Sequence, residues 1–238
     1  MRAVAPQSVA WLAALLLAGC APKPEQPSPA DIQAARRAAV EFELRLKREI
    51  TGRLEREEDP VAVYMSYADH TPDWGREISN ELELNFSRTA LGVRNPANAP
   101  DAWESRQLEM FNFYMDAGLD PDTFEIAEIV QEGEETVFRW MQPVRMMDTC
   151  LTCHGEKIDP RIKLLLAQEY PLDEAAGYAE GQIGGAYSVR KVLRVKDQPA
   201  PPWTPIPAPQ TPLADQRLPG DAPLVAPVAT PSAEAPQQ

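Results

Sequence analysis

Two cysteines three residues apart, followed at once by a histidine, constrain this chain more than any other feature. The run Cys150-Leu151-Thr152-Cys153-His154 has the C-x-x-C-H spacing of covalent haem attachment. Two thiols at this spacing reach the two vinyl groups of one porphyrin, and the adjoining imidazole reaches the iron from the same face. The motif therefore predicts one covalent haem c, attached to Cys150 and Cys153, with His154 as the proximal iron ligand.

A C-x-x-C pair also occurs in dithiol redox motifs and as half of a structural zinc site. The chain has three cysteines, and Cys20 belongs to a separate pattern near the N-terminus, so no second C-x-x-C pair completes a four-sulfur zinc site. A thioredoxin-like context is also missing, because a short stretch containing lysine, aspartate, proline and arginine follows His154-Gly155 instead of a long apolar helix. The haem interpretation is favoured over both alternatives.

The N-terminus has the pattern of a lipoprotein export signal. Residues 1–19 contain the basic Arg2, a mostly apolar run over 9–17, and the end of a lipobox, Leu17-Ala18-Gly19-Cys20. The apolar run is shorter than the roughly 20 residues that a permanent membrane-spanning helix needs. We expect cleavage before Cys20 and lipidation of its thiol; the alternative is an ordinary cleaved signal with an unmodified cysteine. Ala21 resembles the sorting pattern of outer-membrane lipoproteins and favours the periplasmic face of that membrane.

The charge balance limits the partners of the chain. Acidic residues number 36 against 23 basic ones, and the formal net charge is −13 at pH 7. Such a surface repels nucleic acid and anionic lipid headgroups, so membrane contact is expected to come from the N-terminal lipid. A redox protein is the expected protein partner, and the sequence leaves the oligomeric state undetermined.

Composition divides the mature chain into three parts. Residues 20–29 form a proline-rich tether, residues 30–197 a haem domain, and residues 198–238 a tail expected to be disordered, in which 12 of the last 40 residues are proline. Ser28 and Pro29 are typical of a helix start. A long amphipathic helix is predicted from apolar residues at steps of three and four, namely Ile32, Ala35, Ala39, Phe42, Leu46, Ile50 and Leu54.

The rest of the domain mixes helices and strands. A short helix is predicted over 60–70, stopped and restarted by Thr71-Pro72, and another helix opens at Pro100-Asp101. Alternating runs over 124–130 and 136–141 predict a hairpin, residues 162–166 a helical piece, and residues 186–190 a third strand. A small antiparallel sheet with flanking helices makes the fold class α+β.

Several stretches resemble a known family, the single-haem c-type proteins with a PAS-like fold, long catalogued as a domain of unknown function. The resemblance covers roughly residues 30–195. The stretches that carry it are Gly92 to Glu104, Trp140 to Pro143, Cys150 to Gly155, Tyr170 to Tyr178 and Gly184 to Val189. The family occurs alone and as the extracytoplasmic sensor part of signalling proteins. The resemblance implies a PAS-like antiparallel sheet and a haem bound by the motif histidine.

In that family the opposite axial ligand is a cysteine, and the matching position here is Ser66. Three replacements remain open: His70, one helical turn beyond Ser66 on the same face; Met65, which points about 100° away; or a vacant sixth position beside Ser66. Arg94 has two open roles, as the partner of a haem propionate or as a brace for its own loop.

These features predict a lipid-anchored, periplasm-facing mono-haem protein that acts in electron transfer or redox sensing. One alternative is a haem enzyme or gas-binding sensor with an open sixth site, although a peroxidase also needs a distal acid–base group. Another is an accessory lipoprotein of a respiratory or photosynthetic complex. The sixth iron ligand decides between electron transfer or redox sensing and an open-site enzyme or gas sensor. Two histidines favour a low-potential haem, methionine raises the potential, and a vacancy permits gas binding.

Overall fold

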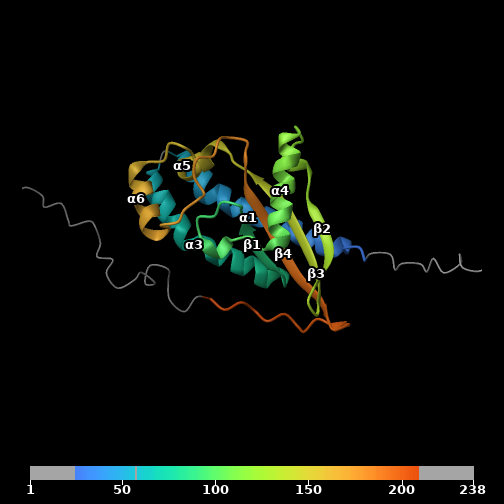
Figure 1. The fold of residues 1–238 in the computed structure, drawn as a ribbon. Helices are drawn as coiled ribbons and strands as arrows, with labels where there is room; N and C mark the ends of the chain where they lie inside the picture. The colour runs from blue at the N-terminus through green and yellow to red at the C-terminus, as the bar shows by residue number, and fades with distance from the viewer. Residues whose placement is uncertain (1–24, 57, 209–238) are drawn as a thin grey trace, which may run out of the picture.

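A five-stranded antiparallel sheet lies at the centre of the computed structural model, which describes residues 25–56 and 58–208 (Figure 1). Four strands follow the order β1-β4-β3-β2, and the short β5 pairs with β4. The strands are β1 (Asn85–Thr89), β2 (Ile126–Glu132), β3 (Glu135–Arg145), β4 (Ile183–Val195) and β5 (Gln198–Pro199). The predicted hairpin and third strand are confirmed as β2, β3 and β4, and the α+β class with them.

Six α-helices accompany the sheet in the described part of the chain. They are α1 (Pro29–Leu46), α2 (Gly52–Leu54), α3 (Pro60–Leu82), α4 (Ala102–Asp116), α5 (Leu151–His154) and α6 (Pro160–Glu169). Helix α1 starts as predicted, because the Ser28 side chain accepts a hydrogen bond from the backbone N–H of Asp31. The π-helical turn η1 (Lys47–Thr51) joins α1 to α2, so the long N-terminal helix is not α-helical throughout.

The predicted break at Thr71-Pro72 is wrong, because α3 runs through this point to Leu82. A proline inside a helix removes the N–H that would bond to the carbonyl four residues earlier. Helix α3 buries Val63 and Tyr64 before this point and Ile78 after it, so packing on both sides holds the helix continuous. Tertiary burial here outweighs the local cost of one missing hydrogen bond.

Helices cover both faces of the sheet (Figure 1). On one face α1 and α3 contribute Ala35, Phe42 and Ile78 to a buried cluster with Phe138 and Trp140 of β3. On the opposite face the buried residues of α4, namely Trp103, Leu108 and Phe111, pack on Met141, Ile183 and Ala186. Because both faces are buried, the free ends of the sheet are where a site can form.

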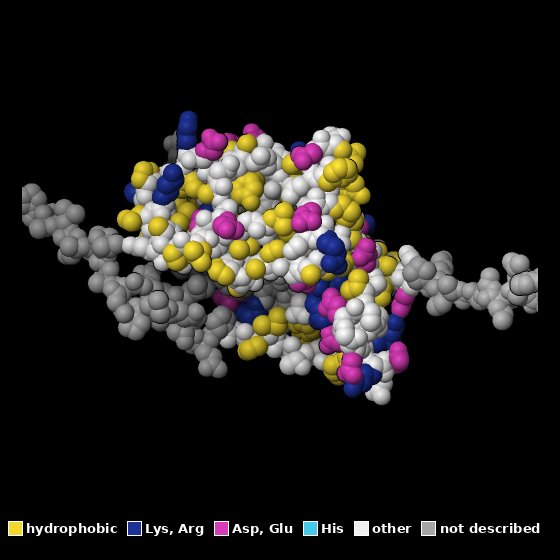
Figure 2. Space-filling model, viewed as in Figure 1, with side chains coloured by type: hydrophobic (Ala, Val, Ile, Leu, Met, Phe, Trp, Pro, Cys, Tyr) yellow, Lys and Arg dark blue, Asp and Glu magenta, His cyan; other side chains and the backbone are white. Residues whose placement is uncertain are grey.

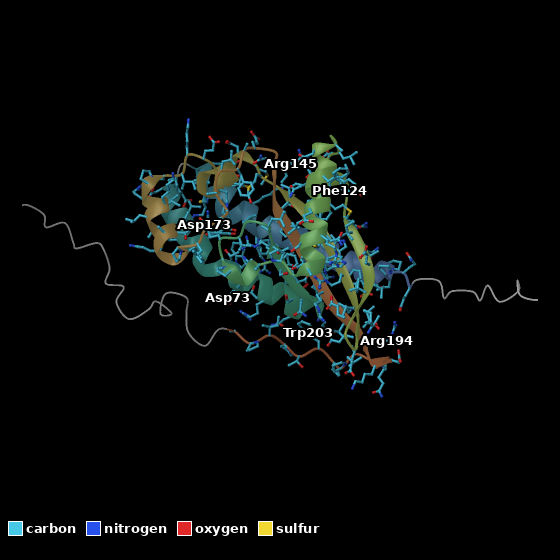
Figure 3. All side chains as sticks on the ribbon, viewed as in Figure 1. Asp73, Phe124, Arg145, Asp173, Arg194 and Trp203 are labelled. Carbon is cyan, nitrogen blue, oxygen red and sulfur yellow. The ribbon has the colours of Figure 1, made fainter. Side chains whose placement is uncertain are left out.

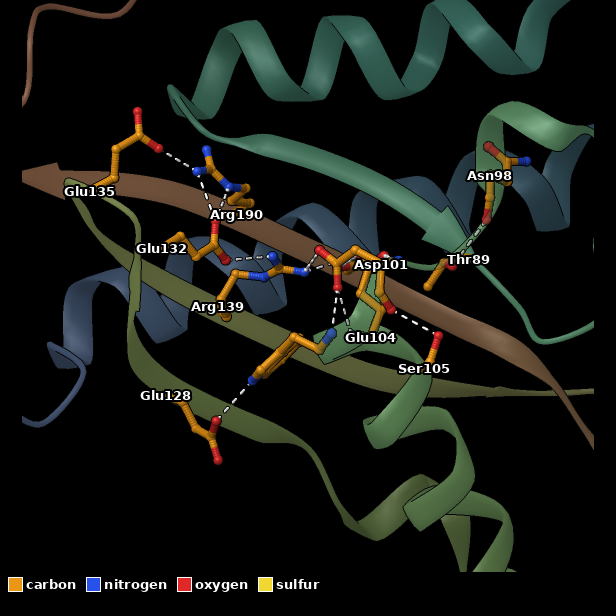
Figure 4. Close-up of polar contacts among 12 residues, drawn as sticks. Thr89, Asn98, Asp101, Glu104, Ser105, Glu128, Glu132, Glu135, Arg139 and Arg190 are labelled. Atoms are coloured by element: carbon orange, nitrogen blue, oxygen red, sulfur yellow. Dashed lines mark hydrogen bonds and ion pairs between the residues drawn. The ribbon is translucent and has the colours of Figure 1, made fainter.

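A buried arginine ties the start of α4 to the sheet (Figure 4). Arg139 of β3 is 2% exposed and forms ion pairs with Asp101 at 2.7 Å, Glu132 at 2.8 Å and Glu104 at 3.4 Å. Its guanidinium also lies 4.7 Å from the centre of the Trp103 ring. Asp101, at the predicted start of this helix, is its N-cap, with a complete capping box. A buried charge has to be paired, and here one cation serves a helix cap and two strands.

Two strands were missed by the sequence patterns. Strand β1 has little apolar alternation, and β5 is two residues long. Lys196 and Asp197 turn β4 into β5 with positive φ angles of 50° and 61°.

After β5 the chain extends back to α3, where the backbone of Ile206 both donates to and accepts from the Asn80 side chain, at 2.8 and 3.0 Å. The start of the predicted disordered tail therefore contacts the domain; residues 209–238 lie outside the described residues.

The surface divides by chemistry (Figure 2). Charged side chains of both signs gather at the end of the sheet where β2 turns into β3, with pairs such as Lys196–Glu134 and Arg190–Glu135. Hydrophobic side chains are spread over the face above α4 and α6, where Phe113 and Leu164 are exposed. Within residues 25–56 and 58–208, none of the helices has the length and apolar character needed to cross a membrane.

We expect Arg139→Met to lower the free energy of unfolding by about 3–5 kcal/mol, because it leaves the largely buried Glu104 and the partly buried Glu132 without their cation. Chemical denaturation followed by circular dichroism measures this change. Lys196→Met is the matched control, since the Lys196–Glu134 pair is 65% exposed on both sides and its loss should change stability little. Equal effects of the two changes would contradict the role given to Arg139.

Candidate functional site

The C-x-x-C-H motif lies where β3 leaves the sheet. The 3₁₀ turn Asp148–Cys150 leads directly into α5, so both thiols and the imidazole lie on about one and a half helical turns. Both cysteines are free thiols and half-buried, and burial is the main factor that raises the pKa of each. Upstream, Met146 forms two backbone hydrogen bonds of 2.8 Å, with Gly181 and Gln182. The motif therefore starts from a fixed point at the end of the sheet.

His154 is held in one orientation. Its Nδ1 lies 2.7 Å from the carbonyl oxygen of Ala175, which can only accept, so the proton is on Nδ1 and the lone pair on Nε2. Burial, aided by the charge of Arg94, lowers the pKa of His154 to about 4. A neutral imidazole with a free Nε2 and a backbone carbonyl behind it is the usual arrangement of a metal-binding histidine.

Arg94 braces the segments around this histidine. Its Nε donates to Asp173 at 3.0 Å, and its Nη2 donates to the carbonyl of Cys153 at 2.7 Å and to that of Ala175 at 3.3 Å. Asp173 lies on the segment between α6 and β4 (Figure 3). These contacts fit a bracing role for Arg94, which is one of the two roles that the sequence left open. The other role, as the partner of a haem propionate, stays a prediction, because no contact here tests it.

Gly155 allows the chain to pass close to its own helical turn. A Cβ atom at this position would lie 2.7 Å from the carbonyl oxygen of Leu151, too close for any other residue without a backbone shift. Gly155 then forms a parallel bridge with Tyr178, and the N–H of Tyr178 donates to the carbonyl of His154 at 3.0 Å. The glycine after the motif is thus required by the close approach of the chain to Leu151.

Helix α3 packs against the motif. Tyr64 of α3 and Ile158, Ile162 and Leu166 around α6 form a buried cluster, and both Met65 and Cys153 pack against it. The Tyr64 hydroxyl donates to Glu169 at 2.8 Å, which fixes α3 to α6. Met65, one of the three candidates for the sixth iron position, therefore lies on the same cluster as an attachment cysteine.

The π-helical turn η1 contacts both α3 and the start of the motif. The Ser66 hydroxyl donates to Glu49 at 2.6 Å, and the hydroxyls of Thr51 and Thr149 lie 3.3 Å apart. Glu49 also pairs with Arg53 at 2.7 Å. This turn was not predicted, because Leu46, Ile50 and Leu54 keep the four-residue spacing of a regular α-helix through it. π-Helical turns are frequent at functional sites.

Two predicted site residues fall where the structure gives no side-chain description. The backbone of His70 is part of α3, but its side chain lies outside the described part of the structure. Cys20 lies outside the described residues altogether. The choice of sixth ligand among His70, Met65 and a vacancy beside Ser66, and lipidation of Cys20, stay predictions.

The residues that are described fit one kind of group. The free thiols of Cys150, at the end of the 3₁₀ turn, and Cys153, on α5, can form two thioether bonds, and the Nε2 of His154 is available as a ligand from the adjoining position. This donor set fits a porphyrin attached through its vinyl groups.

We expect Arg94→Met and Asp173→Asn each to lower the free energy of unfolding, because their side chains are only 13% and 14% exposed and each change leaves the partner charge unpaired. The double variant should lose less than the sum of the two, by a coupling energy of about 0.5–3 kcal/mol. Denaturation of the four proteins of this double-mutant cycle measures the coupling. Additive effects would show that the pair does not act as a brace.

Comparison with known proteins gives a family and a fold. No curated protein matches the chain. The crystal structure of the cyanobacterial heme-protein Tll0287 is similar, with a TM-score of 0.53 and 19% sequence identity over 71% of this chain and 99% of that one; at this identity the likeness shows the fold alone. The model of the Tll0287-like family matches residues 30–191. The resemblance found in the sequence is thereby confirmed, and the chain belongs to the Tll0287-like family.

Proposed function

We propose that this protein carries one covalent haem c and acts as an electron carrier or redox sensor. One observation carries the proposal: His154, directly after two free thiols, has its Nδ1 bound to the Ala175 carbonyl at 2.7 Å and its Nε2 free. The similar structure is of a heme-protein by its own description, which supports the same cofactor here.

Each residue of the site has a distinct task in this proposal. Cys150 and Cys153 hold the porphyrin, and His154 ligates its iron, which supplies one-electron chemistry when the group is bound. Ala175 keeps the imidazole in the correct tautomer, and Arg94 holds Ala175 in place. The antiparallel sheet with helices on both faces supports the PAS-like assignment of the domain.

The setting of the protein is part of the proposal and rests on sequence alone. A lipid on Cys20 would hold the domain at the periplasmic face of a membrane, with the outer membrane favoured by Ala21. An acidic protein of net charge −13 is suited to a redox partner with a basic docking surface. Export also fits the cofactor, because bacterial haem attachment to C-x-x-C-H motifs takes place outside the cytoplasm.

We expect the protein, produced in a host that matures c-type cytochromes, to have the mass of its mature chain and lipid plus one haem, and to keep the haem on a denaturing gel. Cys150→Ala and Cys153→Ala should each leave at most one thioether bond, and the double variant should leave none. Mass spectrometry measures the mass of each protein, and haem staining of the gel shows whether the haem stays attached. A wild-type protein without covalent haem would overturn the proposal.

Absorption spectra test the sixth ligand. If His70 is the ligand, the wild-type iron is low-spin and does not bind carbon monoxide, and His70→Ala makes it high-spin and able to bind the gas. Met65→Leu, a change of similar volume on the same helix, is the matched control and should leave the spectrum unchanged. A spectrum altered only by Met65→Leu would move the assignment to the thioether. Carbon monoxide binding by the wild type would favour the open-site alternative.

A further inference from the structure

Arg88 of β1 forms no ion pair with any carboxylate that the structure describes. Within residues 25–56 and 58–208, it is the one partly or fully buried arginine that forms no ion pair; the others are Arg45, Arg53, Arg76, Arg94, Arg139, Arg145, Arg190 and Arg194. A protein with 36 acidic residues has many carboxylates to offer. An uncompensated guanidinium that is partly removed from water is costly unless an anion reaches it.

Aromatic rings hold this guanidinium in place. Its carbon lies 4.9 Å from the centre of the Phe42 ring and 5.8 Å from that of Tyr67, and one of its N–H groups donates to the Tyr67 hydroxyl. These contacts orient the group but do not neutralise it, because neither ring carries a formal charge. A guanidinium has five N–H donors, so donors remain for an anionic ligand.

Arg88 is held by the helix that carries the candidates for the sixth iron position. Tyr67, its hydrogen-bond partner, directly follows Met65 and Ser66 on α3. In the sheet Arg88 pairs with Tyr187 of β4.

Arg94, unlike Arg88, already has a carboxylate partner. Its guanidinium already pairs with Asp173 and donates to the carbonyls of Cys153 and Ala175. A second carboxylate would have to displace a contact that holds the motif together. Of the two arginines near the site, Arg88 is therefore the one with charge and donors to spare.

We propose that Arg88 binds a propionate carboxylate of the haem, while Arg94 only braces the site. The inference rests on the proposed function, because it requires a porphyrin at the motif. A guanidinium matches a carboxylate with two parallel N–H donors, and the pair would place one positive charge beside the cofactor. Tyr67 and Phe42 then act as positioning residues that hold the guanidinium.

The experiment uses the haem-loaded wild type, Arg88→Gln, Arg88→Lys and Arg190→Gln. Arg190 is the matched control, because it is also a half-buried sheet arginine but pairs with Glu132 and Glu135. We expect Arg88→Gln to lower the reduction potential, since loss of a nearby positive charge disfavours adding an electron to the iron. Arg88→Lys should recover most of the potential, and Arg190→Gln should leave it near that of the wild type.

Infrared spectroscopy gives an independent reading. With carbon-13 at the haem propionate carboxyls, the redox difference spectrum of the wild type should show an isotope-sensitive carboxylate band that moves in Arg88→Gln and stays in Arg190→Gln. Circular dichroism shows whether each variant is folded, and the wild-type band can be read even if Arg88→Gln does not fold.

The outcomes separate the two proposals. Absence of covalent haem from the wild type overturns the proposed function and this inference together. A haem-loaded, folded Arg88→Gln with the potential and propionate band of the wild type overturns the inference alone. An isotope-sensitive band in the wild type at the position of an unpaired carboxylate also overturns it.

Discussion

The ion pair between Arg94 and Asp173 is the interaction on which the site depends. It joins the loop after β1 to the segment between α6 and β4, and the same guanidinium holds the carbonyl of Cys153 inside the motif. Both side chains are largely removed from water, so the attraction between them is screened less than in a surface pair. Removing either side chain alone lowers stability, because it leaves the other charge unpaired. The orientation of His154 follows from it, through the shared carbonyl of Ala175.

The two faces of the sheet have different tasks. On the face of α4, the buried Arg139 collects the carboxylates of Asp101, Glu104 and Glu132, so the helix cap, the strands and the charge balance depend on one another. On the other face, α1 and α3 pack on the sheet through aromatic side chains, and the first turns of α3 also pack against the motif. The first arrangement gives rigidity, and the second places Met65 on the same cluster as Cys153.

Three arginines of the domain differ in whether their charge is already paired. Arg139 and Arg94 are each paired with carboxylates, and removing either leaves charge that is largely removed from water unpaired. Arg88 is held by rings and one hydroxyl, which fixes its position but gives it no ion pair among the described side chains. Two arginines six residues apart in the sequence thus have opposite electrostatic situations. A residue type alone would not have separated them.

The sequence by itself determined what short-range chemistry can specify: the thiol spacing and adjoining imidazole, the N-cap at Ser28, the start of a helix at Asp101, the β2–β3 hairpin and the α+β class. These follow from covalent spacing, capping and period-two patterning, which involve neighbours along the chain. Only the tertiary structure decided that α3 continues through Pro72, that β1 and β5 join the sheet, and that Arg94 braces the motif. The reason is physical: burial on both sides of a proline, pairing of strands with weak patterns, and ion pairs between residues about 80 positions apart all depend on contacts between distant segments, which local patterns do not contain.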